Sequence, residues 1–422
     1  MSDDRLTHLR DVGDLLWPAP LRMDVGDTGD PSGEVQREYL LLPDDRHPRL
    51  LVPRDRRAAV SALRGYGVGR GRTARWKAAG LTAAMAVGVA PLLLRNRVRL
   101  TGPAGAASIE GHLADVLGGE VLVSMYLGAP RANRKPVLQV LTADGRTLAY
   151  VKVGVDPLTC RLVQDEAAAL TALSAAGLRR ATVPTVLHSG RWNGLELLVL
   201  SPLPVRGRRR PEPAQLAAAQ AEIAAIGATP AAPLSRSPYW AALTDRVEAL
   251  PSGTAAETLS ELTGRIGSTF GAVPLSLGAW HGDWTPWNTA RAGKDLLVWD
   301  WERFGPAVPV GFDALHWALQ TDLVTHLADP AASAARALAT AEAVLQPFRL
   351  SEEQAAATAV CYLAELATRY LADRQVEAGA RLGNVGEWLL PAIGQATGRA
   401  TGQATGQAIT GTAPALRSRR PE

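Results

Sequence analysis

The stretch that decides the fold is LGAWHGDWTPWNTA, Leu277–Ala290, together with LLVWDWE, Leu296–Glu302. The first segment carries Asp283 and, with four residues between them, Asn288; in the second, a short apolar run ends at Asp300. A loop that reverses direction can bring Asp283 and Asn288 together, and a hairpin strand then delivers Asp300 opposite them. The pattern therefore predicts a cluster of oxygen-bearing side chains on a loop and the hairpin that follows it.

These residue types suit the transfer of a phosphoryl group. The reaction needs a group that orients the attacking hydroxyl and accepts its proton, and it needs metal ions that neutralise the triphosphate. Asp283 can do the first, and Asn288 and Asp300 offer the oxygen ligands that Mg²⁺ demands. Because the chemistry is mostly positioning and charge neutralisation, few side chains suffice.

The order His281-Gly282-Asp283, Asn288, Asp300-Trp301-Glu302 resembles the catalytic and metal-binding segments of aminoglycoside phosphotransferases and choline kinases, which have the protein-kinase-like fold. The resemblance implies that Asp283 is the catalytic base and that Asn288 and Asp300 are the magnesium ligands. It also implies structural roles for His281, which braces the loop, and for Asp313, in VGFDALHW. It covers about residues 108–390 and does not extend to residues 1–105.

A kinase-like fold also needs a lysine on its third strand, paired with a glutamate on the following helix. The strand-like run Thr147–Val153 contains Lys152, and the helical pattern Arg161–Ala176 carries Asp165 and Glu166. The resemblance implies that Glu166 is the partner of Lys152. A lysine that extends its ammonium to the surface is the alternative reading.

The remaining pattern indicates an α+β, bilobal protein-kinase-like fold with a five-stranded N-lobe sheet and a mainly helical C-lobe. The five strand-like runs are Val121–Leu127, Val137–Thr142, Thr147–Val153, Thr185–Ser189 and Leu195–Leu200. Asp-Gly between the second and third runs is a strong hairpin signal. We expect an N-terminal extension at 1–105 (a hairpin plus helices), an N-lobe at 106–203, a C-lobe at 204–392 and a disordered low-complexity tail at 393–422.

Nucleotide contacts are expected at two places. The hinge residues Leu200, Ser201 and Leu203 would supply backbone groups for adenine, and ATP with Mg²⁺ are the expected cofactors. The loop Gly128–Pro136 contains a single glycine, so a glycine-rich phosphate cover is absent. Arg131 and Asn133 would contact the phosphates instead, unless this is only an exposed basic loop.

The acceptor is harder to predict. Trp284 and Trp287 lie inside the catalytic loop, where they form either an apolar wall for a substrate or packing contacts. Glu302, two residues after Asp300, is a candidate auxiliary acid. None of these residues identifies the acceptor.

Composition bounds the remaining possibilities. The net charge is +4 over 422 residues and most arginines are scattered, which disfavours a nucleic-acid partner. The two cysteines indicate free thiols in a reducing cytoplasm. Residues 78–94 lack charge but include Pro91, so a buried or interfacial helix is expected rather than a stable membrane span.

The sequence therefore predicts an ATP- and Mg²⁺-dependent phosphotransferase that acts on a small-molecule hydroxyl group. One alternative is a nucleotide-binding regulatory or scaffold module on the same fold. Another is a kinase of a larger acceptor, a protein or a glycan. Fold and motif do not choose the substrate, and the oligomeric state stays open.

Overall fold

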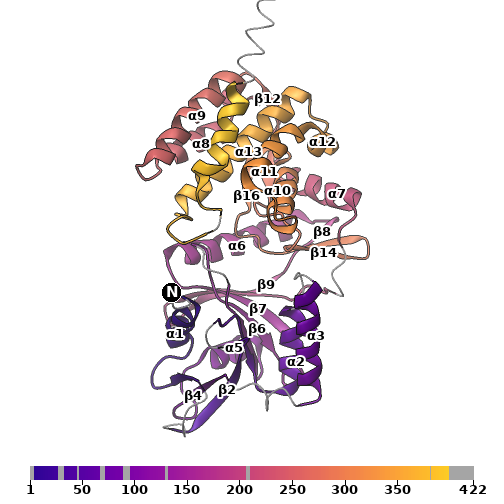
Figure 1. Ribbon diagram of the computed structural model, residues 1–422. Coiled ribbons are helices and arrows are strands. Elements are labelled where there is room, and N and C mark those ends of the chain that lie inside the picture. The colour runs from indigo at the N-terminus through magenta and orange to yellow at the C-terminus, as the bar shows by residue number, and fades with distance from the viewer. Residues whose placement is uncertain are drawn as a thin grey trace, which may run out of the picture. The chain divides into compact units, whose positions relative to one another are not determined.

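The computed structural model describes residues 4–26, 33–44, 47–66, 72–88, 96–128, 132–205, 210–380 and 382–398. The chain forms two compact units that interleave along the sequence. The first comprises Met1–Glu222, His281–Gly305 and Ala378–Ala380, and the second comprises Ile223–Trp280, Pro306–Glu377 and Arg381–Glu422. Figure 1 shows that the first unit is built on an extended sheet and that the second is a group of helices. The α+β class is confirmed.

An antiparallel sheet of nine strands forms the first unit, in the order β1-β4-β2-β3-β5-β6-β7-β10-β9. The strands are β1 Arg22–Val25, β2 Val35–Leu42, β3 Leu50–Pro53, β4 Arg97–Thr101, β5 Leu122–Tyr126, β6 Val137–Leu141, β7 Thr147–Gly154, β9 Val186–Trp192 and β10 Leu195–Leu200. The expectation of a five-stranded sheet was wrong. All five predicted strands are present, but four strands of residues 22–101 continue the same sheet.

The junction between the two sets of strands is the pairing of β3 with β5, in which Leu50 lies opposite Tyr126 and Leu51 opposite Met125. Without β3, strand β5 would be an edge strand with a row of unpaired N–H and C=O groups. The hydroxyl of Ser124 adds a hydrogen bond of 2.9 Å to the carbonyl oxygen of Leu51. The N-terminal strands therefore complete the sheet rather than forming a separate layer.

Alternate residues of β2 belong to two different hydrophobic cores, one on each face of the sheet. Tyr39 and Leu41 belong to a core that also contains residues of α1 (Asp4–Leu16) and α5 (Ile109–Leu117). Leu40 and Leu42 belong to a second core, formed with α2 (Arg56–Tyr66) and α3 (Arg72–Ala86). Successive side chains of a strand point to opposite faces, so a strand covered on both faces reads as a continuous apolar run.

Helix α6 (Pro157–Ala176) positions a candidate site residue, Glu166. It begins four residues before the predicted start because Asp156 and Thr159 form a reciprocal capping box around Pro157. Gly177 ends the helix with a φ of 65°, in the left-handed conformation that glycine adopts most easily.

The second unit is mainly helical, as expected. Its principal helices are α8 Pro238–Glu248, α9 Thr254–Phe270, α10 Phe312–Gln320, α11 Pro330–Ala339, α12 Ala341–Leu345 and α13 Glu352–Ala372. Its short strands are β11 Ala232–Pro233, β12 Pro274–Leu275, β13 Leu277–Trp280 and β16 Gly305–Pro309, the last of which begins at the end of the first unit. Helix α13 is buried almost continuously from Ala357 to Thr368, which makes it the centre of this core.

Two predicted segments are only partly described. Residues 389–398 are helical and Ile393 is fully buried, so helical structure extends into the first six residues of the expected tail, whereas residues 399–422 lie outside the described residues. Helix α3 covers the beginning of the uncharged run 78–94, and residues 89–94 lie outside the described residues. In the described part of the chain, no helix is long and apolar enough to cross a membrane.

A substitution at the junction tests whether the N-terminal strands stabilise the lobe. Leu51 is 1% exposed in the core that joins both sets of strands. We expect Leu51→Ala to lower the free energy of unfolding by about 2–5 kcal/mol, the usual cost of a core cavity. The matched control, Val35→Ala, alters a side chain that is 40% exposed, so its effect should stay within about 0.5 kcal/mol. Urea denaturation measures both, and equal midpoints would contradict the shared core.

Candidate active site

Lys152 of β7 lies at the centre of the site. Its ammonium forms an ion pair of 2.5 Å with Oε2 of Glu166 and a second with Oδ1 of Asp300. The predicted pairing with Glu166 is present, and the surface alternative for Lys152 does not hold, because the residue is only 8% exposed. Strand β7, helix α6 and the turn after β15 (Asp295–Val298) therefore meet at one charged group.

The charge state of this lysine follows from its partners. Burial by itself lowers the pKa of Lys152, but the carboxylates of Asp300 and Glu166 outweigh it and raise the pKa above its ordinary value. A buried ammonium without partners would cost several kcal/mol. Because the pKa of Lys152 lies above its ordinary value, its ammonium is charged at neutral pH.

His281 braces the loop through both ring nitrogens. Its Nδ1 accepts the backbone N–H of Asp283 at 3.0 Å. The other nitrogen, Nε2, lies 3.1 Å from the carbonyl oxygen of Trp299, so it carries the proton and donates it there. The fully buried ring thereby connects the loop to the strand that precedes Asp300.

Asp283 and Asn288 are brought together as predicted, although not as two separate functional groups. The side-chain amide of Asn288 donates to Oδ2 of Asp283 at 2.9 Å and to its carbonyl oxygen at 3.0 Å. The backbone carbonyl of Asn288 accepts the N–H of Trp299 at 3.1 Å. Asn288 therefore fixes the orientation of the Asp283 carboxylate, which is itself half-buried.

Two positions with positive φ shape the backbone around these groups. Gly282 has φ 81°, and a Cβ atom placed there would lie 2.1 Å from the carbonyl oxygen of Arg303. Asp300 has φ 74°, a conformation that costs a non-glycine residue roughly 1–2 kcal/mol. Such strain persists only where the surroundings fix it, and it is frequent at functional sites.

Trp301 supplies much of that constraint. Its backbone N–H donates to Oε1 of Glu166 at 3.1 Å, and its indole N–H donates to the carbonyl of Val298 at 3.0 Å. The ring packs against His281 with a centroid distance of 4.4 Å. Trp284, predicted as a substrate wall or a packing residue, is fully buried beside the same rings and so packs inside the loop.

Glu302 has partners that the sequence did not indicate. Its carboxylate accepts a hydrogen bond of 3.1 Å from Nδ2 of Asn133 and forms an ion pair with Lys135, and both charged side chains are 5% exposed. Lys135 lies in the glycine-poor loop, immediately before Pro136. The loop contains other basic residues, and nothing in the sequence distinguishes Lys135 from them. The loop is thus tied to the turn that carries Asp300.

Three carboxylates form a group that could hold a metal ion. One oxygen from each of Glu166, Asp300 and Glu302 lies within 4.8 Å of the others. Such hard oxygen donors suit Mg²⁺. All three already have partners in the chain, because Glu166 and Asp300 both bind Lys152 and Glu302 binds Lys135. The side chain of Asp300 is 26% exposed, whereas Glu166 is fully buried, so Asp300 is the most accessible of the three. The side-chain amide nitrogen of Asn288 binds Asp283, and its Oδ1, the atom that would hold a metal, stays a predicted ligand.

The other predicted residues that the structure describes belong to the end of β10 and the segment after it, to the catalytic loop and to the second unit. Ser201 donates its N–H to the carbonyl of Thr185 at 2.9 Å and accepts from the N–H of Thr185 at 2.8 Å. Leu200 ends β10, and the carbonyl of Leu203 accepts the N–H of Val205. Trp287 is half-buried. Asp313 is buried in the first turn of α10 in the second unit, and Arg131 lies outside the described residues.

A family model described as the phosphotransferase enzyme family matches residues 136–348, half of the chain. No curated protein matches the chain.

Among solved structures, the chain is similar to a thermostable mutant of aminoglycoside phosphotransferase APH(4)-Ia in complex with ADP and hygromycin B. The identity is 12%, the match covers 70% of this chain and 99% of that chain, and the TM-score is 0.47. A provisionally assigned fructosamine-3-kinase from Haemophilus somnus 129PT has 15% identity over 68% of this chain and 96% of that chain, with a TM-score of 0.40. Amicoumacin kinase hAmiN, in complex with AMP-PNP, Ca²⁺ and Ami, has 10% identity over 66% and 88%, with a TM-score of 0.41.

The close approach at Gly282 gives a testable contrast. Gly282→Ala adds a Cβ atom against the Arg303 carbonyl, whereas Gly293→Ala, also at positive φ, meets nothing within 4 Å. Both substitutions place an alanine in the left-handed backbone region, which lowers the free energy of unfolding by about 1–2 kcal/mol. Only Gly282→Ala must also displace the loop. We expect it to lower the urea midpoint clearly more than the Gly293 control does. Equal midpoints would show that the loop relaxes freely.

Proposed function

Because the chain belongs to the phosphotransferase enzyme family, we propose that it transfers the terminal phosphoryl group of ATP to a hydroxyl group of a small molecule, with Mg²⁺ as the metal. The observation that carries this proposal is the pairing of two arrangements within one unit. One is Asp283 oriented by Asn288, and the other is Lys152 held between Glu166 and Asp300. The first suits a proton acceptor and the second a nucleotide-binding cation.

The reaction makes one bond and breaks one. The acceptor oxygen forms a bond to the γ-phosphorus, and the bond from that phosphorus to the β,γ-bridging oxygen breaks, so ADP leaves with the bond's electron pair. The proton of the acceptor hydroxyl passes to the carboxylate of Asp283. Asn288 holds one carboxylate oxygen through its amide at 2.9 Å, which presents the other oxygen in a defined direction.

Lys152 contributes a fixed positive charge. In the absence of nucleotide its ammonium bonds to Glu166 and Asp300, and it has three donors, so one remains for a phosphate oxygen. Asp300 and Glu302 would hold the Mg²⁺ ion, which when bound neutralises charge on the phosphates. Glu166 keeps the lysine in place, because it is fully buried and also accepts the N–H of Trp301.

The glycine-poor loop would act through side chains rather than through backbone amides. Asn133 and Lys135 approach the turn at Asp300 because both bind Glu302. This arrangement places a second ammonium next to the proposed metal ligands. It supports a role for the loop on the phosphate side of the site, where the sequence suggested Arg131 and Asn133.

The acceptor is defined here only as a small molecule with a hydroxyl group. A screen of ATP consumption with aminoglycosides, choline-like amines, sugars, nucleosides and macrolides as acceptors identifies its class. The screen also provides the substrate with which the variants below are measured.

Asp283→Asn tests the proton acceptor. The amide cannot accept the proton, so we expect turnover to fall roughly a hundred- to ten-thousand-fold. Nucleotide affinity should be retained, because the proposed nucleotide contacts belong to Lys152 and the metal ligands and not to Asp283. Asp295→Asn, at the start of β15, is the matched control and should leave turnover unchanged. ADP release and nucleotide titration measure the two quantities.

The same experiment distinguishes an active kinase from the alternative, a nucleotide-binding regulatory module. Unchanged turnover in Asp283→Asn would reject the proposed base. Nucleotide binding without turnover on any acceptor would instead favour a nucleotide-binding module.

Asp300→Ala tests the metal ligand. In the unaltered protein we expect nucleotide to bind at least about tenfold more tightly with Mg²⁺ than without it, a difference of about 1.4 kcal/mol. The variant should lose this dependence, whereas Asp295→Ala should keep it. Isothermal titration of ATP with and without Mg²⁺ gives both affinities. A magnesium dependence that survives in Asp300→Ala would overturn the assignment.

A further inference from the structure

A cavity of about 390 Å³ lies beside the N-terminal strands, outside the candidate active site. Its walls come from β2, β4, the loop that follows β4, the first turns of α5 and the start of β5. Of its lining residues only Ala143 falls within residues 136–348, the segment that matches the family model. The cavity therefore belongs to the part of the chain for which the phosphotransferase activity provides no role.

The floor of the cavity is a buried carboxylate, Glu110, which is 1% exposed. Its Oε2 accepts the indole N–H of Trp17 at 2.9 Å, and its Oε1 accepts the hydroxyl of Tyr39. Burial and the neighbouring Glu110 carboxylate raise the pKa of Tyr39 well above its ordinary value, so the phenol keeps its proton. Both donors fix the carboxylate, and each oxygen can still accept a further bond.

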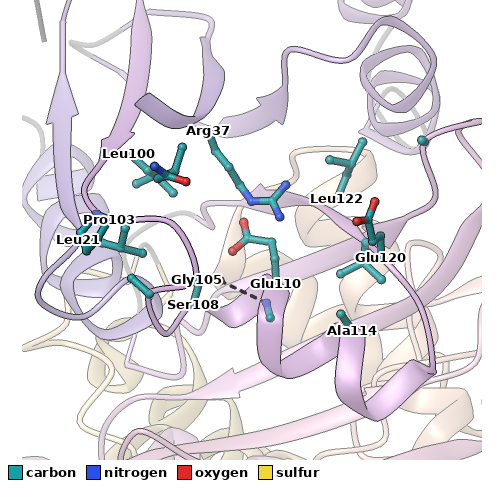
Figure 2. A pocket seen from close by; sticks show the side chains of 15 residues that line it. Leu21, Arg37, Leu100, Pro103, Gly105, Ser108, Glu110, Ala114, Glu120 and Leu122 are labelled. Atoms are coloured by element: carbon teal, nitrogen blue, oxygen red, sulfur yellow. Dashed lines mark hydrogen bonds between the residues drawn. The ribbon is translucent and has the colours of Figure 1, made fainter. Parts of the chain in front are cut away.

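Arg37 projects into the cavity from above this floor. It lies two residues before Tyr39 on β2, and side chains two apart share a face. The register between β2 and β4 shifts between Val35 and Arg37, a bulge of the kind that redirects side chains. Figure 2 shows its guanidinium and the Glu110 carboxylate pointing toward one another.

The Arg37 guanidinium forms no hydrogen bond or ion pair within the described ranges of the chain. An arginine offers five N–H donors, and Arg37, which lines the cavity, is half-buried. By contrast, Gln36 beside it is satisfied, because its amide donates to the carbonyl of Gly102 at 2.8 Å. The donors of Arg37 are therefore available to an acceptor from outside the chain.

The rest of the lining defines the ligand further. Glu120 adds a second carboxylate, so the cavity has one guanidinium and two carboxylates. Apolar side chains complete the lining, with Leu21 and Leu100 on one side of Arg37 and Leu122 on the other. A phosphate would bind Arg37 but would face both carboxylates, and a simple amine would leave Arg37 unsatisfied. A molecule with one anionic group, one cationic group and an apolar body satisfies all three parts of the lining.

We propose that this cavity binds a free α-amino acid with an apolar side chain. The ligand's carboxylate accepts from Arg37, its ammonium faces the carboxylates of Glu110 and Glu120, and its side chain lies against Leu21 and Leu100.

Isothermal titration of the full chain, without nucleotide, tests the proposal with three probes. L-Phenylalanine carries both charges, phenylpropionate lacks the ammonium, and phenethylamine lacks the carboxylate. We expect L-phenylalanine to bind at least about tenfold more tightly than either fragment, because each charge-assisted contact is worth that much or more. Inorganic phosphate should bind more weakly than L-phenylalanine.

Two variants locate the binding. Arg37→Gln should lower the affinity for L-phenylalanine at least about tenfold and leave the affinity for phenethylamine unchanged. Arg22→Gln alters an exposed arginine of β1 that does not line the cavity, and it should have no effect. Ala114→Leu places a larger side chain of α5 in the cavity and should lower the affinities for both L-phenylalanine and phenethylamine. Circular dichroism melting shows that each variant is folded.

The proposal fails if L-phenylalanine produces no heat, if either fragment binds equally well, or if Arg37→Gln leaves its affinity unchanged. None of these outcomes bears on phosphoryl transfer, because no nucleotide or acceptor is present.

Discussion

The ion pairs of the buried Lys152 ammonium are the interaction on which the rest of the site depends. Its two carboxylate partners lie 14 and 148 residues further along the chain. Desolvating three charges is costly, and the cost is offset only if all three keep their geometry. Removing either carboxylate leaves a poorly compensated charge in the interior. The positions of β7, α6 and the turn after β15 are therefore not independent of one another.

The turn after β15 has an intrinsically unfavourable backbone conformation, which its surroundings stabilise. Asp300 has a positive φ, and its neighbours offset the penalty. Trp301 binds Glu166 through its backbone, while His281 binds the carbonyl of Trp299. The same Glu166 thus contacts both the lysine and the strained turn, so one helix residue aligns the cation with its carboxylate partner. Because these contacts are buried, the arrangement is preorganised and little reordering is needed when ligands bind.

The parts that the sequence predicted correctly are those with local signals. Asp-Gly marks the β6–β7 hairpin, and the apolar run around Lys152 followed by a helix with Glu166 predicts their pairing. The pairing of β3 with β5 has no such signal, because it is made by backbone N–H and C=O groups, which every strand carries whatever its side chains. The contact between Lys135 and Glu302 joins two loops far apart in the chain, and no spacing rule connects them. The early start of α6 depended on recognising Asp156 as its cap.

The sheet also links the two ends of the first unit. Leu122 lines the N-terminal cavity at one end of β5, and the loop that leads to Asn133 and Lys135 leaves the other end. A ligand in the cavity and a nucleotide beside Glu302 would therefore contact two ends of one strand and its loop. If binding at one end changes affinity at the other, linkage requires the reverse effect to have the same magnitude. A reciprocal change would show that the two sites are coupled and do not merely share a lobe.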